Sequence, residues 1–306
     1  MTIEIEIYNA VKSNSLLFLN RGMKELVSHN DLNDVPLNTE ITTVSVLFLQ
    51  TSFELALNAY SINKYGLSSI LNKKQVSLSD DEIRNLYSLN ELPTKNISTL
   101  LKELNESDGL FSDVEDIYHI EHFKNIRNKF AHLNCNLFEN DLYDIKYELI
   151  YFVSRILVSL IADTDSQWTT SLVLSDYLDK DIYKKLISYP PYLMEMESVA
   201  KRNSENVYHC FYCNNETFAT ETEFCYICNY DYSSYKFIDC DLCSAKNSVI
   251  YDHLNIAING NEARGLCLNC KEDDIYYICP VCGNSYGVEA NCGNNICSST
   301  SCLNSV

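Results

Sequence analysis

Cysteines at metal-ligand spacing are the first chemical feature of this 306-residue sequence. Thirteen of its fourteen cysteines lie between residues 210 and 302, and ten of these form Cys-x-x-Cys pairs. The pairs are Cys210–Cys213, Cys225–Cys228, Cys240–Cys243, Cys267–Cys270 and Cys279–Cys282. Two thiolates at this spacing ligate one ion from a tight turn, and two such turns complete a tetrahedral site. The spacing therefore predicts closed metal sites that stabilise a fold and leave no position open for catalysis.

Pairing of consecutive turns gives the simplest ligand sets, which together hold about three structural zinc ions. The first set is Cys210, Cys213, Cys225 and Cys228, and the second is Cys240, Cys243, Cys267 and Cys270. The third combines Cys279 and Cys282 with two of the last three cysteines, and Cys297 and Cys302 are favoured over Cys292. Pairing of alternate turns is an alternative, as is an iron–sulfur cluster. Zinc is preferred because the Tyr-, Ile- and Phe-rich strand candidates between the turns are typical of zinc ribbons.

Charge and hydropathy restrict the classes of function. The net charge is −19, with −10 over residues 1–165, −2 over 166–200 and −7 over 201–306. Such acidity argues against a general nucleic-acid binder, because phosphate backbones favour positive surfaces. The most apolar stretch, 149–162, contains Arg155 and is shorter than the ~20 residues that cross a bilayer. The amino terminus does not resemble a signal peptide, so a cytoplasmic protein with reduced cysteines and no membrane partner is expected.

A second pattern suits phosphate chemistry. The segment 126–133, Ile-Arg-Asn-Lys-Phe-Ala-His-Leu, places Arg127 and His132 five residues apart. A histidine moves protons near neutral pH, and an arginine fork holds a phosphate and the extra charge of its transition state. Asn128 is expected to bind the phosphate or to orient His132, and Lys129 adds to a locally basic stretch. The simpler interpretation pairs Arg127 with an acidic neighbour and makes His132 a helix C-cap.

Hydrophobic periodicity and cap residues predict the helices that position these side chains. The expected helices cover 4–28, 40–65, 80–89, 96–105, 113–133, 140–163, 175–188 and 192–202. Their strongest boundary signals are Asn38 and Ser79 before a helix and Gly66 after one. Positions 127 and 132 differ by about 140° on an ideal helix. We therefore expect His132 to face Arg127 only if the helix ends near Ala131.

Domain boundaries follow from the change in cysteine content and in periodicity. Residues 1–165 are predicted to form an all-α helical bundle, and 166–205 a helical linker that is interrupted at Pro190-Pro191. Residues 206–306 are predicted to form small, β-rich zinc-ribbon modules in tandem. The expected fold class is therefore multidomain, with a helical bundle followed by zinc ribbons.

Two segments of the first domain carry a family resemblance. Arg127-Asn128-Lys129-Phe130-Ala131-His132 looks like an Arg-Asn-x-x-x-His signature, and Phe53 to Tyr60, with Lys64-Tyr65-Gly66 after it, is similar to a Glu-Leu-Leu-Leu-Lys-rich helix. Both features resemble the HEPN superfamily of ribonucleases over residues 1–165. They depart from it at Asn58, where a lysine is common. The resemblance implies a bundle that dimerises and cleaves RNA without metal, in a cleft that combines two Arg-x4-His motifs. Glu54 and Lys129 are possible auxiliary residues.

The leading interpretation is a metal-independent endoribonuclease of the HEPN type. Proteins of this build resemble bacterial toxins and anti-phage defence effectors, and the zinc ribbons would then recognise a protein partner such as an inhibitor, a sensor or a phage trigger. The alternative is a non-catalytic, HEPN-like dimerisation or binding adaptor with zinc ribbons. A third interpretation, a zinc-ribbon factor associated with transcription, is disfavoured by the acidity of the chain.

Overall fold

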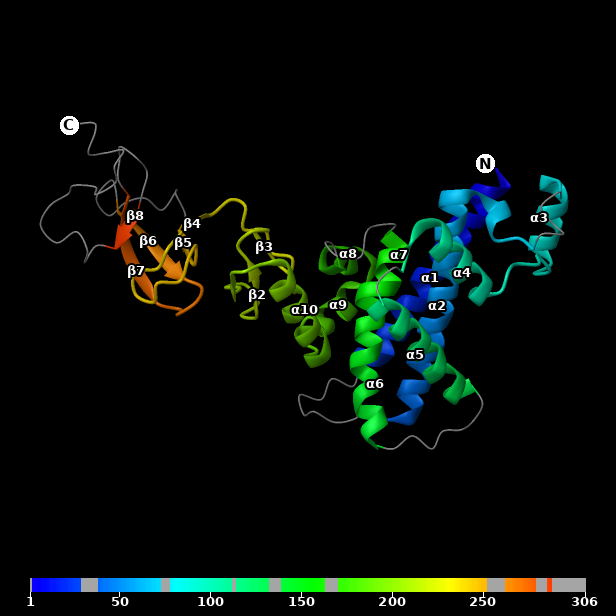
Figure 1. Ribbon diagram of the computed structural model, residues 1–306, viewed down its shortest axis with the longest axis horizontal. Coiled ribbons are helices and arrows are strands. Elements are labelled where there is room, and N and C mark those ends of the chain that lie inside the picture. Colours follow the sequence, from blue (N-terminus) through cyan, green and yellow to red (C-terminus); the bar gives the residue numbers. More distant parts are fainter. Residues whose placement is uncertain are drawn as a thin grey trace, which may run out of the picture. The chain divides into compact units, whose positions relative to one another are not determined.

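The computed structural model describes residues 2–28, 38–72, 78–111, 114–131, 139–162, 170–251, 262–278 and 285–287. The chain divides into two compact units, Met1–Tyr192 and Leu193–Val306. Figure 1 shows helices throughout the described part of the first unit and short strands in the second. This distribution confirms the predicted order of a helix-rich part followed by small sheets that carry the cysteines.

The described elements of the first unit are helical. They are α1 (Ile3–Ser28), α2 (Thr39–Tyr65), η1 (Leu67–Ser69), α3 (Asp80–Ser88), α4 (Ile97–Asp108), α5 (Val114–Ala131), α6 (Glu139–Tyr151), η3 (Phe152–Leu157), α7 (Val158–Ala162), α8 (Thr170–Tyr177) and α9 (Lys180–Leu186). The short elements η1 and η3 are a 3-10 turn and a π-helical turn.

Local cap chemistry sets several of these helix ends. The Asn38 side chain accepts a hydrogen bond from the Ile41 N–H at the start of α2, which satisfies a backbone donor that a helix start otherwise leaves unpaired. Ser79 and Glu82 form a reciprocal capping box at the start of α3. Gly66 ends α2 with a φ of 79°, a conformation that glycine adopts without the steric cost of a side chain. The predicted boundaries at Asn38, Gly66 and Ser79 are therefore confirmed.

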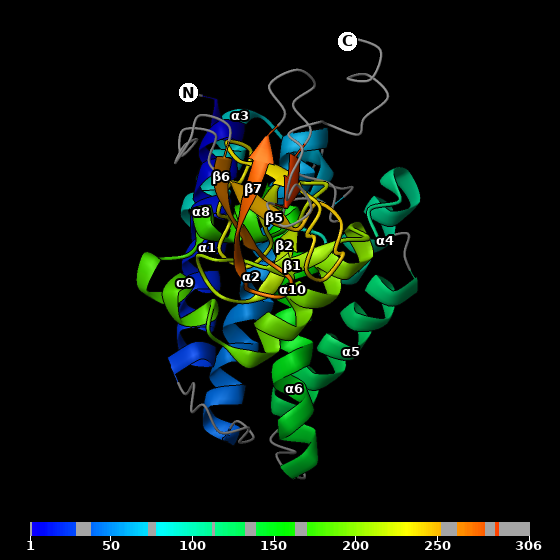
Figure 2. The ribbon, with the colours of Figure 1, turned by 90° about the vertical axis from the view of Figure 1, so that its left-hand side faces the viewer.

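The core of the helical unit lies where α1 and α2 run alongside each other, with α5 and α6 packed near α2 (Figures 1 and 2). Gly22 of α1 allows close approach, because a Cβ atom there would lie 2.8 Å from Leu49 Cγ. Ser15 and Ser52 exchange hydrogen bonds with each other's carbonyl oxygens across the same interface. These contacts fix the register of α1 against α2.

Aromatic packing joins α5 to this core. The Phe152 ring, in η3, stacks on Phe123 of α5 with ring centres 3.9 Å apart. It also meets Phe53 of α2 edge-on at 5.1 Å. All three side chains are buried. The inner face of α5 is therefore anchored in the core of the helical unit.

The segment predicted as a linker, 166–205, contributes to both units. A break between α8 and α9 replaces the single helix expected over 175–188. At that break, Asn20 of α1 donates to the Tyr177 carbonyl oxygen at 2.8 Å and accepts from the Asp179 N–H at 2.7 Å. These bonds tie the break to α1, so α8 and α9 belong to the helical unit.

The boundary between the two units falls within α10 (Pro190–Asn203), whose first residues are the two prolines. Proline is well tolerated at a helix start because the first N–H groups need no partner within the helix. Two antiparallel sheets follow. The first contains β1 (Val207–His209), β2 (Glu216–Ala219) and β3 (Phe224–Cys225) in that order. The second contains β4 (Lys236–Ile238), β5 (Val249–Tyr251), β6 (Glu262–Cys267), β7 (Asp273–Ile278) and β8 (Ser285–Gly287).

Candidate functional site

The four Cys-x-x-Cys turns in the described residues share one backbone pattern. In each turn the N–H of the first cysteine donates to the carbonyl of the residue five positions later, and the N–H four positions later donates back to the first cysteine's carbonyl. The residue after the second cysteine has a positive φ in every turn. These residues are Asn214 (60°), Asn229 (57°), Ser244 (59°) and Lys271 (63°). The repeated turn points both cysteine side chains of a pair to one side.

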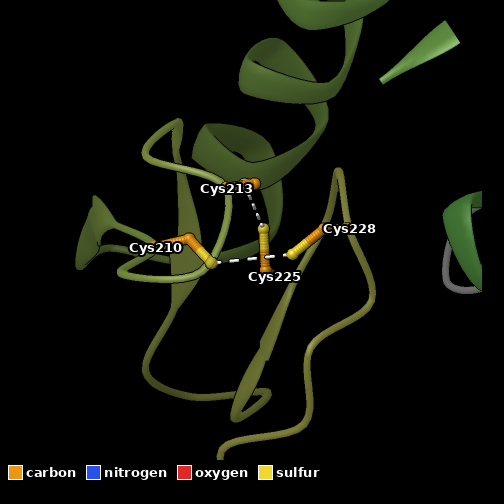
Figure 3. Close-up of side chains that lie close together, drawn as sticks. All are labelled: Cys210, Cys213, Cys225 and Cys228. Carbon is orange, nitrogen blue, oxygen red and sulfur yellow. Dashed lines mark hydrogen bonds between the residues drawn. The ribbon is translucent and has the colours of Figure 1, made fainter. Parts of the chain in front are cut away.

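The first cysteine set joins the turn before β2 to the turn that follows β3. The Sγ atoms of Cys210 and Cys228 lie 3.6 Å apart, and those of Cys213 and Cys225 also lie 3.6 Å apart. All four sulfur atoms lie within 4.8 Å of one another. Figure 3 shows the four side chains pointing toward a common centre.

The second set joins the turn after β4 to the turn between β6 and β7. The Sγ atoms of Cys240 and Cys270 are 3.9 Å apart, and those of Cys243 and Cys267 are 3.7 Å apart. These four sulfurs also lie within 4.8 Å of one another. Both groups have the composition expected from pairing of consecutive turns.

The sulfur separations match a single ion in each set. A tetrahedral site with metal–sulfur bonds of about 2.3 Å has sulfur–sulfur edges of about 3.8 Å. A disulfide would bring two sulfurs to about 2.05 Å, and the eight described cysteines are all free. Iron–sulfur clusters distribute their cysteines over several irons, which separates the sulfurs further. Each set can therefore hold one metal ion.

Charge balance within the first set also favours a cation. The sulfur atoms of the four thiols lie within 4.8 Å of one another, so the ionisation of each one affects the others. Four thiolates so close together repel one another unless a positive ion lies between them. A divalent ion removes this conflict, since metal ligation deprotonates thiols.

Polar side chains outside the cysteine pairs contact the sulfur atoms. The buried Tyr232 hydroxyl donates to Cys210 Sγ at 3.1 Å and accepts from the Phe211 N–H at 3.0 Å. Thr217 Oγ1 lies 3.2 Å from Cys225 Sγ. In the second set, Ser248 Oγ lies 3.4 Å from Cys267 Sγ. Cysteine spacing gave no signal for these residues, which orient the predicted ligands.

The predicted third ligand set lies outside the described residues. This applies to its pair Cys279–Cys282, to Cys297 and Cys302, and to the alternative ligand Cys292. The third site remains a prediction from the sequence.

In the helical unit, two residues predicted from separate segments lie together. Arg127 Nη2 of α5 is 3.8 Å from Glu54 Oε1 of α2, and both side chains are 39% exposed. Arg127 Nη1 also donates to Asn128 Oδ1 at 2.9 Å. Glu54 Oε1 accepts from Gln50 Nε2 at 2.7 Å. The guanidinium is thus held at the surface by one carboxylate and one amide, and Gln50 is a member of this network that the sequence analysis did not identify.

The last described residue of α5 is Ala131, and His132 lies outside the described residues. Lys129 lies on another face of α5. Together with His122, Asp144 and Glu148, it lines a cavity of about 240 Å³ between α5 and α6. Lys129 therefore lines the α5–α6 cavity with two carboxylates, whereas Arg127 contacts α2.

Beside that cavity, His119 Nδ1 lies 2.7 Å from Glu148 Oε2, and the His119 ring stacks on Tyr151 with centres 3.8 Å apart. Burial favours a higher pKa for Glu148, but the hydrogen bond and charge of His119, with a smaller contribution from His122, hold it below its ordinary value. The Glu148 carboxylate is therefore ionised at neutral pH. His119 has a clear structural role in this pair.

Comparison with protein-family models, with curated proteins and with solved structures finds no match for this chain. No helix among the described residues has the length and the apolar character needed to cross a membrane. The site must therefore be interpreted from its own chemistry.

Proposed function

We propose that the chain is a metal-independent endoribonuclease of the HEPN type, with zinc as the ion in its cysteine sites. The observation that supports the catalytic part most is the position of Arg127. It is half-exposed, lies one turn before the end of α5, and is oriented by Glu54 and Asn128. The sulfur geometry supports zinc, since four thiolates in a closed tetrahedral set are typical of structural zinc.

The contacts of Arg127 leave it available to a phosphate. An ion pair at 3.8 Å between two partly exposed side chains contributes roughly 0–1 kcal/mol. A phosphate can replace this contact with paired, charge-assisted hydrogen bonds, which are stronger. Asn128 accepts from Arg127 through its oxygen, so its amide hydrogens can donate to a second phosphate oxygen.

In the proposed reaction the RNA supplies its own nucleophile. The 2′-hydroxyl attacks the adjacent phosphorus, the bond to the 5′ oxygen breaks, and a 2′,3′-cyclic phosphate forms. His132 takes the proton from the 2′-hydroxyl or gives one to the leaving oxygen, and Arg127 stabilises the charge of the transition state. A homodimer would bring two such motifs into one cleft, as the family resemblance implies. The zinc-ribbon unit would bind a protein partner that controls cleavage, as in a toxin or an anti-phage effector.

The Glu54–Arg127 ion pair also favours a second candidate function. If Glu54 and Gln50 serve to neutralise Arg127 permanently, the helical unit is a non-catalytic dimerisation or binding adaptor. The net charge of −10 over residues 1–165 agrees with this alternative. The two functions differ in whether removal of His132 changes any RNA-directed activity.

The decisive experiment compares RNA cleavage by the full-length wild type and by His132→Ala, in the presence of EDTA. We expect wild-type products with 2′,3′-cyclic phosphate ends and a rate loss of about 10²–10⁴ in His132→Ala. Arg127→Lys should recover only part of the activity, because an ammonium lacks the planar fork. His122→Ala, a histidine of the same helix outside this site, is the matched control and should cleave normally. Equal cleavage by wild type and by a well-folded His132→Ala would overturn the catalytic role of His132, and no cleavage by a well-folded wild type would favour the adaptor instead.

A further inference from the structure

A second cavity, of about 380 Å³, opens between α4 and α5. One of its lining residues is Asn128, which accepts the hydrogen bond from Arg127. We propose that this groove, here called the α4–α5 groove, binds a nucleotide of single-stranded RNA next to the phosphate that Arg127 contacts. The inference rests on the proposed function and adds to it the substrate-binding surface.

The floor of the groove is apolar and suits a base. Phe111 and Ile120 are buried beneath it, and Ile117, which also lines it, is 42% exposed. A base laid on such a floor removes apolar surface from water, as in single-strand binding sites generally. The amides of Asn105, Asn125 and Asn128 line the same groove and offer donors to base edges or phosphates.

The rim of the groove carries two lysines that can contact a phosphate chain, together with one carboxylate, Glu121. Lys102 of α4 and Lys124 of α5 line it from opposite sides. Lys102 pairs with Glu106 at 3.8 Å, and Lys124 pairs with Glu121 at 2.7 Å. Both side chains of the first pair are well exposed, so that pair contributes little and can yield to a phosphate. In the second pair Glu121 is 61% exposed whereas Lys124 is 20% exposed.

The opposite side of α5 is less suitable for the strand. The cavity between α5 and α6 is lined by two carboxylates, Asp144 and Glu148, against one lysine, Lys129. The α4–α5 groove is lined by two lysines against one carboxylate. Since like charges repel, the balance of charge favours the α4–α5 groove for a phosphate chain. Two lysines also make a small positive surface. It suits a single strand, whereas a duplex needs a broader positive surface.

The test measures binding separately from cleavage. A fluorescein-labelled single-stranded RNA with 2′-O-methyl groups throughout cannot be cut, and its affinity is followed by fluorescence anisotropy over a salt series. The variant Lys102→Gln/Lys124→Gln removes two charges but keeps the length of both side chains. Lys184→Gln/Lys185→Gln, at exposed positions of α9, removes the same charge elsewhere in the unit.

For wild type and the α9 control we expect the same affinity and salt dependence. For the groove variant, each lost phosphate contact should reduce the slope of log K against log salt by about 0.7, and thus by about 1.4 in total. Binding should weaken by roughly tenfold near physiological salt. If the double variant does not fold, Lys102→Gln alone, at a side chain that is 75% exposed, should reduce the slope by about 0.7.

The outcomes separate this inference from the proposed function. An unchanged affinity and slope in the groove variant overturn the groove, even if the wild type cleaves RNA. Undetectable RNA binding by the wild type also overturns it. A reduced slope in the groove variant, with no cleavage by the wild type, supports the groove and rejects the ribonuclease.

Discussion

Substitution of Tyr232 by Phe tests how the first metal site is built. The hydroxyl donates to Cys210 Sγ at 3.1 Å and accepts from the Phe211 N–H at 3.0 Å. The ring packs against Phe218 with centres 4.2 Å apart, and a phenylalanine keeps that contact. The substitution therefore removes two hydrogen bonds and very little packing.

The expected loss can be estimated in two ways. A hydrogen bond to a charged acceptor such as a thiolate contributes about 1.5–3 kcal/mol. Removal of a group that orients a metal ligand typically weakens metal binding about 10–100-fold, or roughly 1.4–2.8 kcal/mol. The two ranges agree, so we expect zinc in the first set to bind about 10–100-fold more weakly.

Competition with a chromophoric zinc chelator measures this change on the full-length protein. Zinc binding should weaken at the first cysteine set and not at the second, because Tyr232 contacts a ligand of the first set. Tyr212→Phe is the control, since Tyr212 lies in the turn between the ligands Cys210 and Cys213 but is 68% exposed. If Tyr232→Phe retains zinc as tightly as Tyr212→Phe does, the hydroxyl does not support the metal ligand and the proposed role of Tyr232 is wrong.

Three further predictions concern the rest of the chain. Elemental analysis should find at least two zinc ions per chain, and about three if the third predicted set is also occupied; one ion or fewer, with disulfides in place of free thiols, would contradict the metal assignment. Because the pKa of Glu148 in the folded chain lies below the ordinary value of a glutamate, its contribution to stability is present above that ordinary value and is lost as the pH falls through the folded-state pKa. Thermal unfolding in acid should therefore be less pH-dependent in Glu148→Gln than in the wild type, and parallel pH profiles would refute the His119–Glu148 pair. Gly22→Ala should lower the melting temperature of the helical unit, because the added Cβ would lie 2.8 Å from Leu49 Cγ. Overpacking of this kind costs about 1–3 kcal/mol, which exceeds the roughly 1 kcal/mol that alanine gains in helix propensity. An unchanged or higher melting temperature would show that α1 and α2 can separate without cost.

Helix ends set by local chemistry could be predicted from the sequence. Asn38, Gly66 and Ser79 act on backbone groups within a few residues of themselves, so their signals need no knowledge of the fold. The break between α8 and α9 could not be predicted in this way. Its backbone groups are satisfied by Asn20, more than 150 residues away in the sequence.

The metal sites show the same division between local and distant information. Two cysteines in one turn are a local pattern, and this pattern predicted the two sets that the structure brings together. The positive φ of the residue after each second cysteine is less evident from the sequence. Asn214 and Asn229 are residues that tolerate the left-handed region, whereas Lys271 is an unusual occupant of it. Tyr232 and Thr217 reach the sulfurs from other strands or turns, so only the folded chain reveals their role.

The three described faces of α5 carry different chemistry, and this bears directly on the proposed site. Arg127 contacts Glu54 of α2, Asn128 lines the α4–α5 groove, and Lys129 lines the cavity between α5 and α6. Successive residues on a helix differ by about 100°, which is why three neighbours reach three environments. A continuous helix would carry His132 about 140° away from Arg127. The described part of α5 ends at Ala131, and the catalytic proposal requires that His132 depart from helical geometry so that it can face Arg127.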